Sequence, residues 1–184
     1  MSLYLVENHI LKPASIKVSN HFNPRPDEQD ISLLVIHNIS LPAGQFATSY
    51  VEDLFLGQLD IEAHPSFVDL QGLRVSAHLF IRRDGEVIQF VPFNQRAWHA
   101  GVSSFAGREN CNDFSIGIEM EGTDDLAYTS EQYSVLIAVT DAIQKAYPKV
   151  THERICGHCD IAPGRKTDPG KAFDWQRFLS ALEK

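Results

Sequence analysis

Apolar residues gather in short runs that predict the strands of a largely buried sheet. The run from Ser32 to Ile36 is aliphatic and β-branched, and a second short run covers residues 155–157. Between them, residues 114–121 alternate between apolar side chains and polar or small ones. Because successive side chains of a strand point to opposite faces, Glu119 and Glu121 are expected to share one face of this strand.

Helical patterns flank these strands. Residues 48–57 begin with Thr and Ser and end with a glycine, which predicts a short capped helix. A longer helix is expected to begin after Thr129 and to reach about Tyr147, where Pro148 ends it. Residues 173–182 predict a last short amphipathic helix.

A β-hairpin is predicted where Asp84 and Gly85 separate two strand-like runs, because Asp-Gly favours the tight turn of a hairpin. Residues 1–30 are expected to be irregular. Residues 92–113 predict a long polar loop, and loops of this length inside a domain are often functional. The mixed order of strands and helices predicts an α/β or α+β fold.

Composition narrows the class of protein. A length of 184 residues predicts one domain over residues 1–184. The formal net charge is −8 without any Lys/Arg-rich block, which argues against binding to nucleic acid or to an anionic membrane. No leader-like segment opens the sequence, and no apolar run approaches the ~20 residues of a membrane span. Because three cysteines suit a reducing compartment, we expect a cytoplasmic protein.

The segment from Gly157 to Gly170 is the strongest candidate for a functional loop, because its two prolines exclude a regular helix. It contains His158, Lys166 and Asp168, and His37 directly follows the first buried strand. Two histidines and a carboxylate are a ligand set that zinc accepts. Each of these residues, taken alone, is equally compatible with an ordinary loop or strand end.

Other side chains have two readings that the pattern alone leaves open. Glu119 is a candidate general base beside a metal, or else a solvent-exposed glutamate of a half-buried strand. Arg74 and Arg108 lie near the site segments and could bind a substrate carboxylate, although most arginines are solvated surface residues. Trp98 and His99 could form a wall of the pocket, or simply pack the long loop onto the sheet.

Cys156 and Cys159 form a C-x-x-C pair, which also occurs in dithiol oxidoreductases. That chemistry needs the first cysteine at a helix N-terminus, where its pKa is lowered. The residues that follow Cys159 are expected to exclude a helix, so this alternative is disfavoured.

Several stretches together resemble the zinc-dependent N-acetylmuramoyl-L-alanine amidases, and in particular their AmpD-type members. The resemblance spans nearly the whole chain and implies a central mixed β-sheet flanked by helices, as in phage amidases and peptidoglycan-recognition proteins. The matching stretches are Leu33–Asn38, Val75–Gly85, Arg96–Val102, Asn112–Glu119 and Gly157–Gly170.

The resemblance implies that His37, His158 and Asp168 bind zinc, that Glu119 and Lys166 are catalytic, and that Asn38 contacts the substrate. The implied reaction cuts the amide between the lactyl group of anhydro-N-acetylmuramic acid and L-alanine of a recycled muropeptide. Arg74, Trp98, His99 and Arg108 are the further substrate-binding candidates. Asn110 departs from the arginine expected there, which puts the contact with the peptide stem in doubt. We expect a monomer, and the alternative function is a non-catalytic muropeptide sensor.

Overall fold

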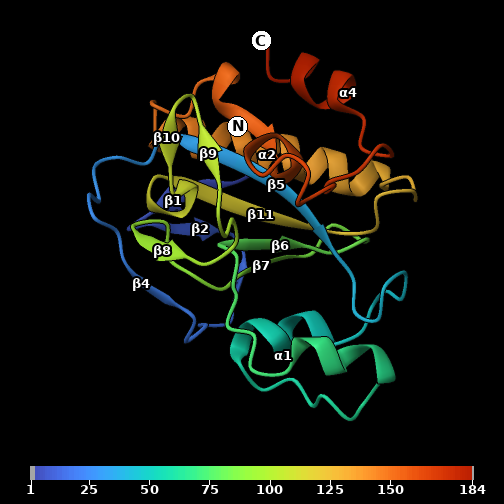
Figure 1. Ribbon diagram of the computed structural model, residues 1–184. Coiled ribbons are helices and arrows are strands. Elements are labelled where there is room, and N and C mark those ends of the chain that lie inside the picture. The colour runs from blue at the N-terminus through green and yellow to red at the C-terminus, as the bar shows by residue number, and fades with distance from the viewer. Residues whose placement is uncertain (1–2, 184) are drawn as a thin grey trace.

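A six-stranded mixed sheet lies at the centre of the computed structural model, which describes residues 3–183 (Figure 1). The first four strands in its order β12-β5-β11-β6-β7-β3 are parallel to one another; β6 and β7 form the predicted hairpin, and β3 pairs parallel to β7. The predicted fold class is confirmed. The strands are β3 (Ser15–Ile16), β5 (Leu33–Ile39), β6 (Leu79–Ile81), β7 (Val87–Gln89), β11 (Ser115–Glu121) and β12 (Ile155–Gly157).

Helices pack on both faces of this sheet and its central strands are buried, whereas both residues of the edge strand β3 are exposed (Figure 1). Helix α2 (Ser130–Ala146) packs against the face formed by alternate apolar residues of β5 and β11. Helix α1 (Tyr50–Leu56) packs against β6 and β7 from the other side. The 3-10 helix η1 (Pro65–Leu70) lies near α1, and α4 (Trp175–Ser180) adds Phe178 to the α2 core.

Helix α2 begins and ends where the sequence predicts. The Thr129 hydroxyl accepts a hydrogen bond from the amide of Gln132 at 3.0 Å, and the Gln132 side chain accepts one from the amide of Thr129 at 3.1 Å. This reciprocal capping box satisfies two amides that a helix start leaves free. Tyr147 ends the helix directly before Pro148.

Residues 1–30 are more regular than predicted where the structure describes them, and so is the loop 92–113. Their strands are only two or three residues long, which is too short for an alternating pattern to show in the sequence. The elements of these two segments outside the central sheet are β1 (Leu5–Glu7), β2 (Ile10–Lys12), β4 (Phe22–Pro24), β8 (Gln95–Ala97), β9 (Ser104–Phe105), β10 (Arg108–Glu109) and the 3-10 helix η2 (Cys111–Asp113); a further 3-10 helix, η3 (His152–Arg154), precedes β12.

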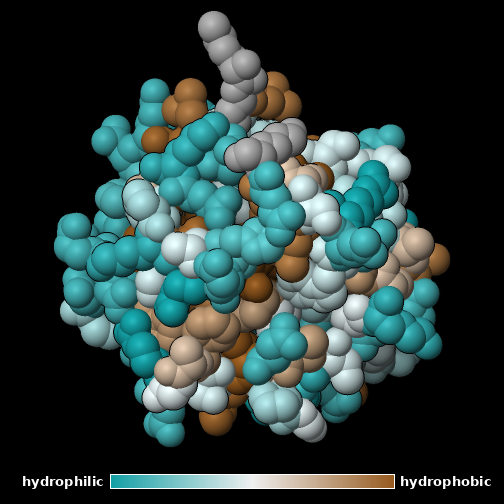
Figure 2. All heavy atoms as spheres, turned by 90° about the horizontal axis from the view of Figure 1, so that it is seen from above, coloured by the Kyte–Doolittle hydropathy of each residue, from teal (hydrophilic) through white to brown (hydrophobic). Residues whose placement is uncertain are grey.

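The face seen from above is largely polar (Figure 2), in keeping with the charge of the chain. Seen from above, mostly hydrophilic and neutral side chains cover the molecule, and apolar atoms are scattered among them (Figure 2). Within residues 3–183, no helix has both the length and the apolar character needed to cross a bilayer.

Both glutamates of β11 are buried, so the alternative that Glu119 is a solvent-exposed glutamate of a half-buried strand is wrong. The reason is that β11 lies between two parallel neighbours, and both of its faces are covered. The Glu121 carboxylate accepts hydrogen bonds from the amides of Ala47 at 2.8 Å and Arg83 at 2.9 Å. It therefore attaches the loop before α1 and the hairpin turn to the sheet.

Replacing Glu121 by alanine should lower the free energy of unfolding by about 3 kcal/mol, because two amides lose their acceptor in a buried site. Urea denaturation at neutral pH measures this change. Glu86 is the matched control, because Glu121 and Glu86 both pair with Arg82, at 3.7 Å and 3.3 Å. The side chain of Glu86 is 47% exposed, whereas that of Glu121 is buried. Glu86→Ala should change the free energy by less than about 0.5 kcal/mol. Equal losses in the two variants would contradict the buried role of Glu121.

Candidate metal centre and active site

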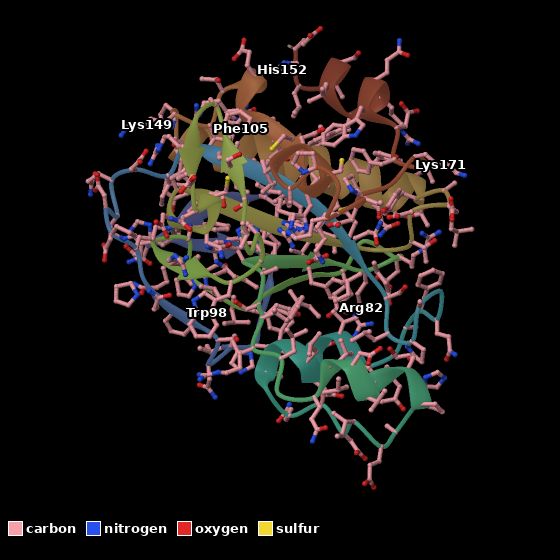
Figure 3. The ribbon with its side chains drawn as sticks, in the orientation of Figure 1. Arg82, Trp98, Phe105, Lys149, His152 and Lys171 are labelled. Carbon is pink, nitrogen blue, oxygen red and sulfur yellow. The ribbon has the colours of Figure 1, made fainter. Side chains whose placement is uncertain are left out.

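Three potential metal ligands converge at the ends of neighbouring strands. His37 lies on β5, and His158 opens the one-turn helix α3 (His158–Ile161) directly after β12. Since β5 and β12 are parallel and pair Ile36 with Gly157, the residues that follow these positions meet at the same edge. Side-chain nitrogens are seen gathered in the middle of the molecule, where β5 and β11 lie side by side (Figure 3).

The ligand atoms lie close together. The Nδ1 atoms of His37 and His158 are 2.9 Å apart, and Asp168 Oδ2 lies 3.1 Å from the first and 3.0 Å from the second. Both histidines are almost fully buried. When these nitrogens are unprotonated, they and the carboxylate repel one another at such distances, and a cation bound between them would offset that repulsion. Together, two imidazoles and one carboxylate fit a catalytic zinc site, in which three protein ligands leave one position open.

The protonation states also suit a metal. Burial lowers the pKa of His37 to about 4, although Asp168 beside it acts in the opposite direction. Burial tends to raise the pKa of Asp168, but its close contacts with the imidazoles of His158 and His37 hold it below the usual value. At neutral pH His37 is therefore neutral and Asp168 is ionised, which are the forms that bind metals.

Glu119 lies beside this cluster, because β11 is the other neighbour of β5 and pairs Glu119 with His37. Its Oε1 atom is 3.9 Å from His37 Nδ1, and its Oε2 atom is buried without a hydrogen-bond partner among the described residues. Burial, and then the charge of Asp168, raise the pKa of Glu119 well above its usual value. A carboxyl group with an unused oxygen and a raised pKa is suited to accept and return a proton.

The loop that carries Asp168 is held at several points. The Tyr128 hydroxyl donates to the carbonyl of Pro169 at 2.8 Å, and the amide of Cys159 donates to the carbonyl of Asp168 at 3.0 Å. Gly170 has a φ of +80°, and a Cβ atom there would lie 2.1 Å from the Cα atom of Asp124. Only glycine fits this close approach, so the loop is as restrained as its prolines predict.

The expectation that the residues after Cys159 exclude a helix is wrong for Asp160 and Ile161, because the one-turn helix α3 runs from His158 to Ile161 before Ala162 ends it. Cys156 nevertheless lies in β12 and not at the first turn of that helix. Burial raises the pKa of the Cys156 thiol, and burial also raises that of Cys159. Neither cysteine is therefore activated as a thiolate, which disfavours dithiol chemistry.

A cavity of about 510 Å³ opens beside Asp168 and holds Lys166 and Asn38 in its wall. The side-chain amide of Asn38 donates a hydrogen bond to Asp124 Oδ1 at 2.8 Å, and both residues line this cavity. The charge of Lys166 is close enough to lower the pKa of Glu119 against the larger effect of burial. The other lining residues are Ile39, Ser40, Ala43, Gly122, Thr123, Asp124, Arg165, Thr167 and Asp168.

Of the five residues predicted to contact substrate, Asn38 lines the cavity beside Asp168 and the other four do not. The Arg74 guanidinium stacks on Trp98 at 5.4 Å, and Trp98 projects on the α1 side of the sheet (Figure 3). Arg108 stacks on Phe114 and pairs with an aspartate at the surface. His99 is buried behind His37. Their roles in substrate binding stay predictions.

Sequence reasoning missed Arg165 and Asp124. Arg165 donates to the carbonyls of Ala100 at 2.6 Å and Val102 at 2.7 Å, and it lines both the main cavity and a neighbouring one of about 380 Å³ that includes Asn110. A usable signal exists for Asp124, because it follows the end of β11 just as His37 lies near the end of β5. No pattern in the sequence singles out Arg165.

Comparison with known proteins gives consistent matches over most of the chain. A family model described as N-acetylmuramoyl-L-alanine amidase matches residues 27–171. The 1,6-anhydro-N-acetylmuramyl-L-alanine amidase AmpD of Escherichia coli K12 is 56% identical over 180 residues, which cover 98% of each chain. A crystal structure of a selenomethionine AmpD derivative matches with a TM-score of 0.94 at 56% identity, covering 97% of this chain and 99% of that one. AmpDh3 from Pseudomonas aeruginosa, in complex with anhydromuramic pentapeptide, matches with a TM-score of 0.63 at 28% identity, covering 91% and 66%.

Proposed function

The chain belongs to the N-acetylmuramoyl-L-alanine amidase family as an AmpD-type member, and we propose that it is a zinc enzyme of cytoplasmic peptidoglycan recycling. The proposed reaction hydrolyses the amide between the lactyl group of anhydro-N-acetylmuramic acid and the L-alanine of a muropeptide. The observation that carries this proposal is the cluster of His37, His158 and Asp168 with the unpartnered carboxyl of Glu119 beside it. The muropeptide complex of the relative AmpDh3 supports the class of substrate. The acting unit is proposed to be a monomer of one domain.

His37, His158 and Asp168 would hold the zinc ion. Bound there, zinc supplies a Lewis acid for the scissile carbonyl and for the attacking water. Glu119 takes a proton from that water at its free oxygen and later gives it to the leaving nitrogen of L-alanine. Its position beside His37, with one carboxyl oxygen that has no hydrogen-bond partner among the described residues, suits both steps.

Lys166 is proposed to stabilise the negative charge that develops on the oxygen of the scissile carbonyl. Lys166 and Asp168 both line the cavity and are two residues apart in the sequence. The ammonium group of Lys166 is therefore available to a substrate that reaches the metal ligands. Asn38, on the same wall, is proposed to hold the substrate by a hydrogen bond from its amide.

Lys166→Gln should lower kcat and kcat/KM together by about 10²- to 10³-fold, because the cation acts mainly on the transition state. Zinc content should remain that of the wild type. Lys171→Gln is the matched control, since Lys171 is a nearby lysine whose side chain is 84% exposed. A raised KM with unchanged kcat in the Lys166 variant would instead assign it to substrate binding.

The proposed function is tested with a purified anhydromuropeptide by mass spectrometry of the products, alongside measurement of bound metal. We expect release of the peptide from the sugar, loss of that activity after treatment with a chelator, and its return with zinc. Full activity in a metal-free sample would reject the zinc assignment. A non-catalytic sensor would bind the muropeptide and leave it intact, and a buried proton acceptor such as Glu119 has no evident use in such a protein.

A further inference from the structure

We propose that His99 positions His37 as a metal ligand, by accepting a hydrogen bond from Nε2–H of His37 and so keeping its Nδ1 lone pair directed at His158 and Asp168. This inference rests on the proposed zinc site. It assigns His99 a role different from contact with substrate.

The contact itself is direct and buried. His37 Nε2 lies 2.9 Å from His99 Nδ1, and His99 Nε2 lies 3.1 Å from the hydroxyl of Ser115. The two imidazole rings meet at an angle of 86°, so that the edge of one ring faces the other. Ser115 and His37 are almost fully buried, and His99 is 9% exposed. Water therefore has little access to compete for these hydrogen bonds.

The direction of this chain of hydrogen bonds decides whether His37 can bind a metal. If His99 Nδ1 accepts from His37, the remaining proton of His99 lies on Nε2 and is donated to Ser115. If the chain runs in the opposite direction, Ser115 donates to His99, which then donates to His37 Nε2. The proton of His37 would then lie on Nδ1, the atom that faces the other two ligands. Only the first direction leaves a free ligand atom.

The local structure fixes the place of the His99 ring. A Cβ atom on Gly117 would lie 2.5 Å from its Cγ atom, so the ring lies directly on the backbone of β11. The side-chain oxygen of Asn112 accepts from the amides of His99 at 3.1 Å and Ala100 at 2.8 Å. These contacts hold His99 beside His37 and Ala100 beside His158.

Ala100, which follows His99, provides the corresponding hydrogen-bond acceptor for His158. The carbonyl of Ala100 lies 3.0 Å from Nε2 of His158, which leaves the Nδ1 atom of that ring free. Metal-binding histidines usually donate their other ring proton to such a partner, and loss of the partner weakens metal binding. The hydrogen-bond acceptor of His37 is therefore the side chain of His99, whereas that of His158 is a backbone carbonyl. Of these two acceptors, only the His99 side chain can be removed by mutation.

Two nearly isosteric variants test this role. His99→Leu removes the acceptor, whereas His99→Asn keeps an oxygen near the position of Nδ1. The zinc dissociation constant is measured by competition with a chromophoric chelator. We expect His99→Leu to weaken zinc binding by about 10- to 100-fold and His99→Asn to restore most of it. Unchanged affinity in the leucine variant would overturn the proposal, and so would equal weakening in both variants, because that would show a packing effect.

Two further measurements complete the test. Failure of the wild-type protein to bind zinc would refute the proposed function itself, whereas wild-type binding with an unaffected leucine variant refutes only the role of His99. Should the leucine variant not fold, nitrogen-15 NMR of the histidine rings in the zinc-loaded wild type decides the question. We expect His99 to carry its proton on Nε2, and a proton on Nδ1 would overturn the proposal.

Discussion

Replacing His37, His158 or Asp168 by alanine should abolish turnover and reduce bound zinc to well below one ion per chain. Loss of a group that merely contacts a ligand already costs about 10- to 100-fold in metal affinity, so loss of a ligand should cost more. Asp168 is the most informative of the three, because its side chain is 14% exposed and the histidines are buried more deeply. The measurements are metal content after gel filtration and product formation by mass spectrometry.

Circular dichroism checks that these variants remain folded, which we expect since the ligands lie outside the apolar core. Asp125→Ala provides the matched control: Asp125 is 75% exposed and pairs with Lys171 near the same loop. It should keep both zinc and activity. Wild-type turnover in any of the three ligand variants would remove that residue from the site.

Glu119→Gln should bind zinc and substrate normally and lose about 10²- to 10⁴-fold in kcat, the usual contribution of a general base. Glutamine keeps the shape of the side chain but cannot take a proton from water. Single-turnover kinetics with the anhydromuropeptide measure the chemical step, and equilibrium dialysis of the zinc-loaded variant measures substrate binding.

Glu121→Gln is the matched control on the same face of β11. It should lower stability, because its carboxylate accepts from two amides, but should keep kcat within about threefold for the folded fraction. Equal losses of kcat in the two variants would mean that the general base has been assigned to the wrong residue of the strand.

The sequence predicts the parts of this structure that depend on local patterns. The strands at Leu33 and Ser115 and the capped start of helix α2 are visible because apolar periodicity and capping residues act over a few positions. The short strands β8, β9 and β10 leave no such pattern. Their pairing is decided by contacts made elsewhere in the fold.

The same division holds for the candidate site. His37 and His158 are detectable because His37 lies near the end of one buried strand and His158 directly follows another, and parallel neighbours bring such positions to one edge. The contact between His99 and His37 joins a loop to a strand across 62 positions, and no local signal encodes it. The role of Arg74 in substrate binding stays a prediction, because proximity in the sequence to site residues does not determine where its side chain points; in the structure it stacks on Trp98.

The order of the strands also sets the time at which the site can exist during synthesis. The ribosome delivers the chain from the N-terminus, so β5 and β11 are available long before β12, which forms the outer edge of the sheet and leads into His158. Until residues 158–168 have emerged, a nascent chain offers only one of the three ligands. In the proposed zinc enzyme, capture of the ion would therefore wait until the segment after β12 has emerged and β12 has paired with β5.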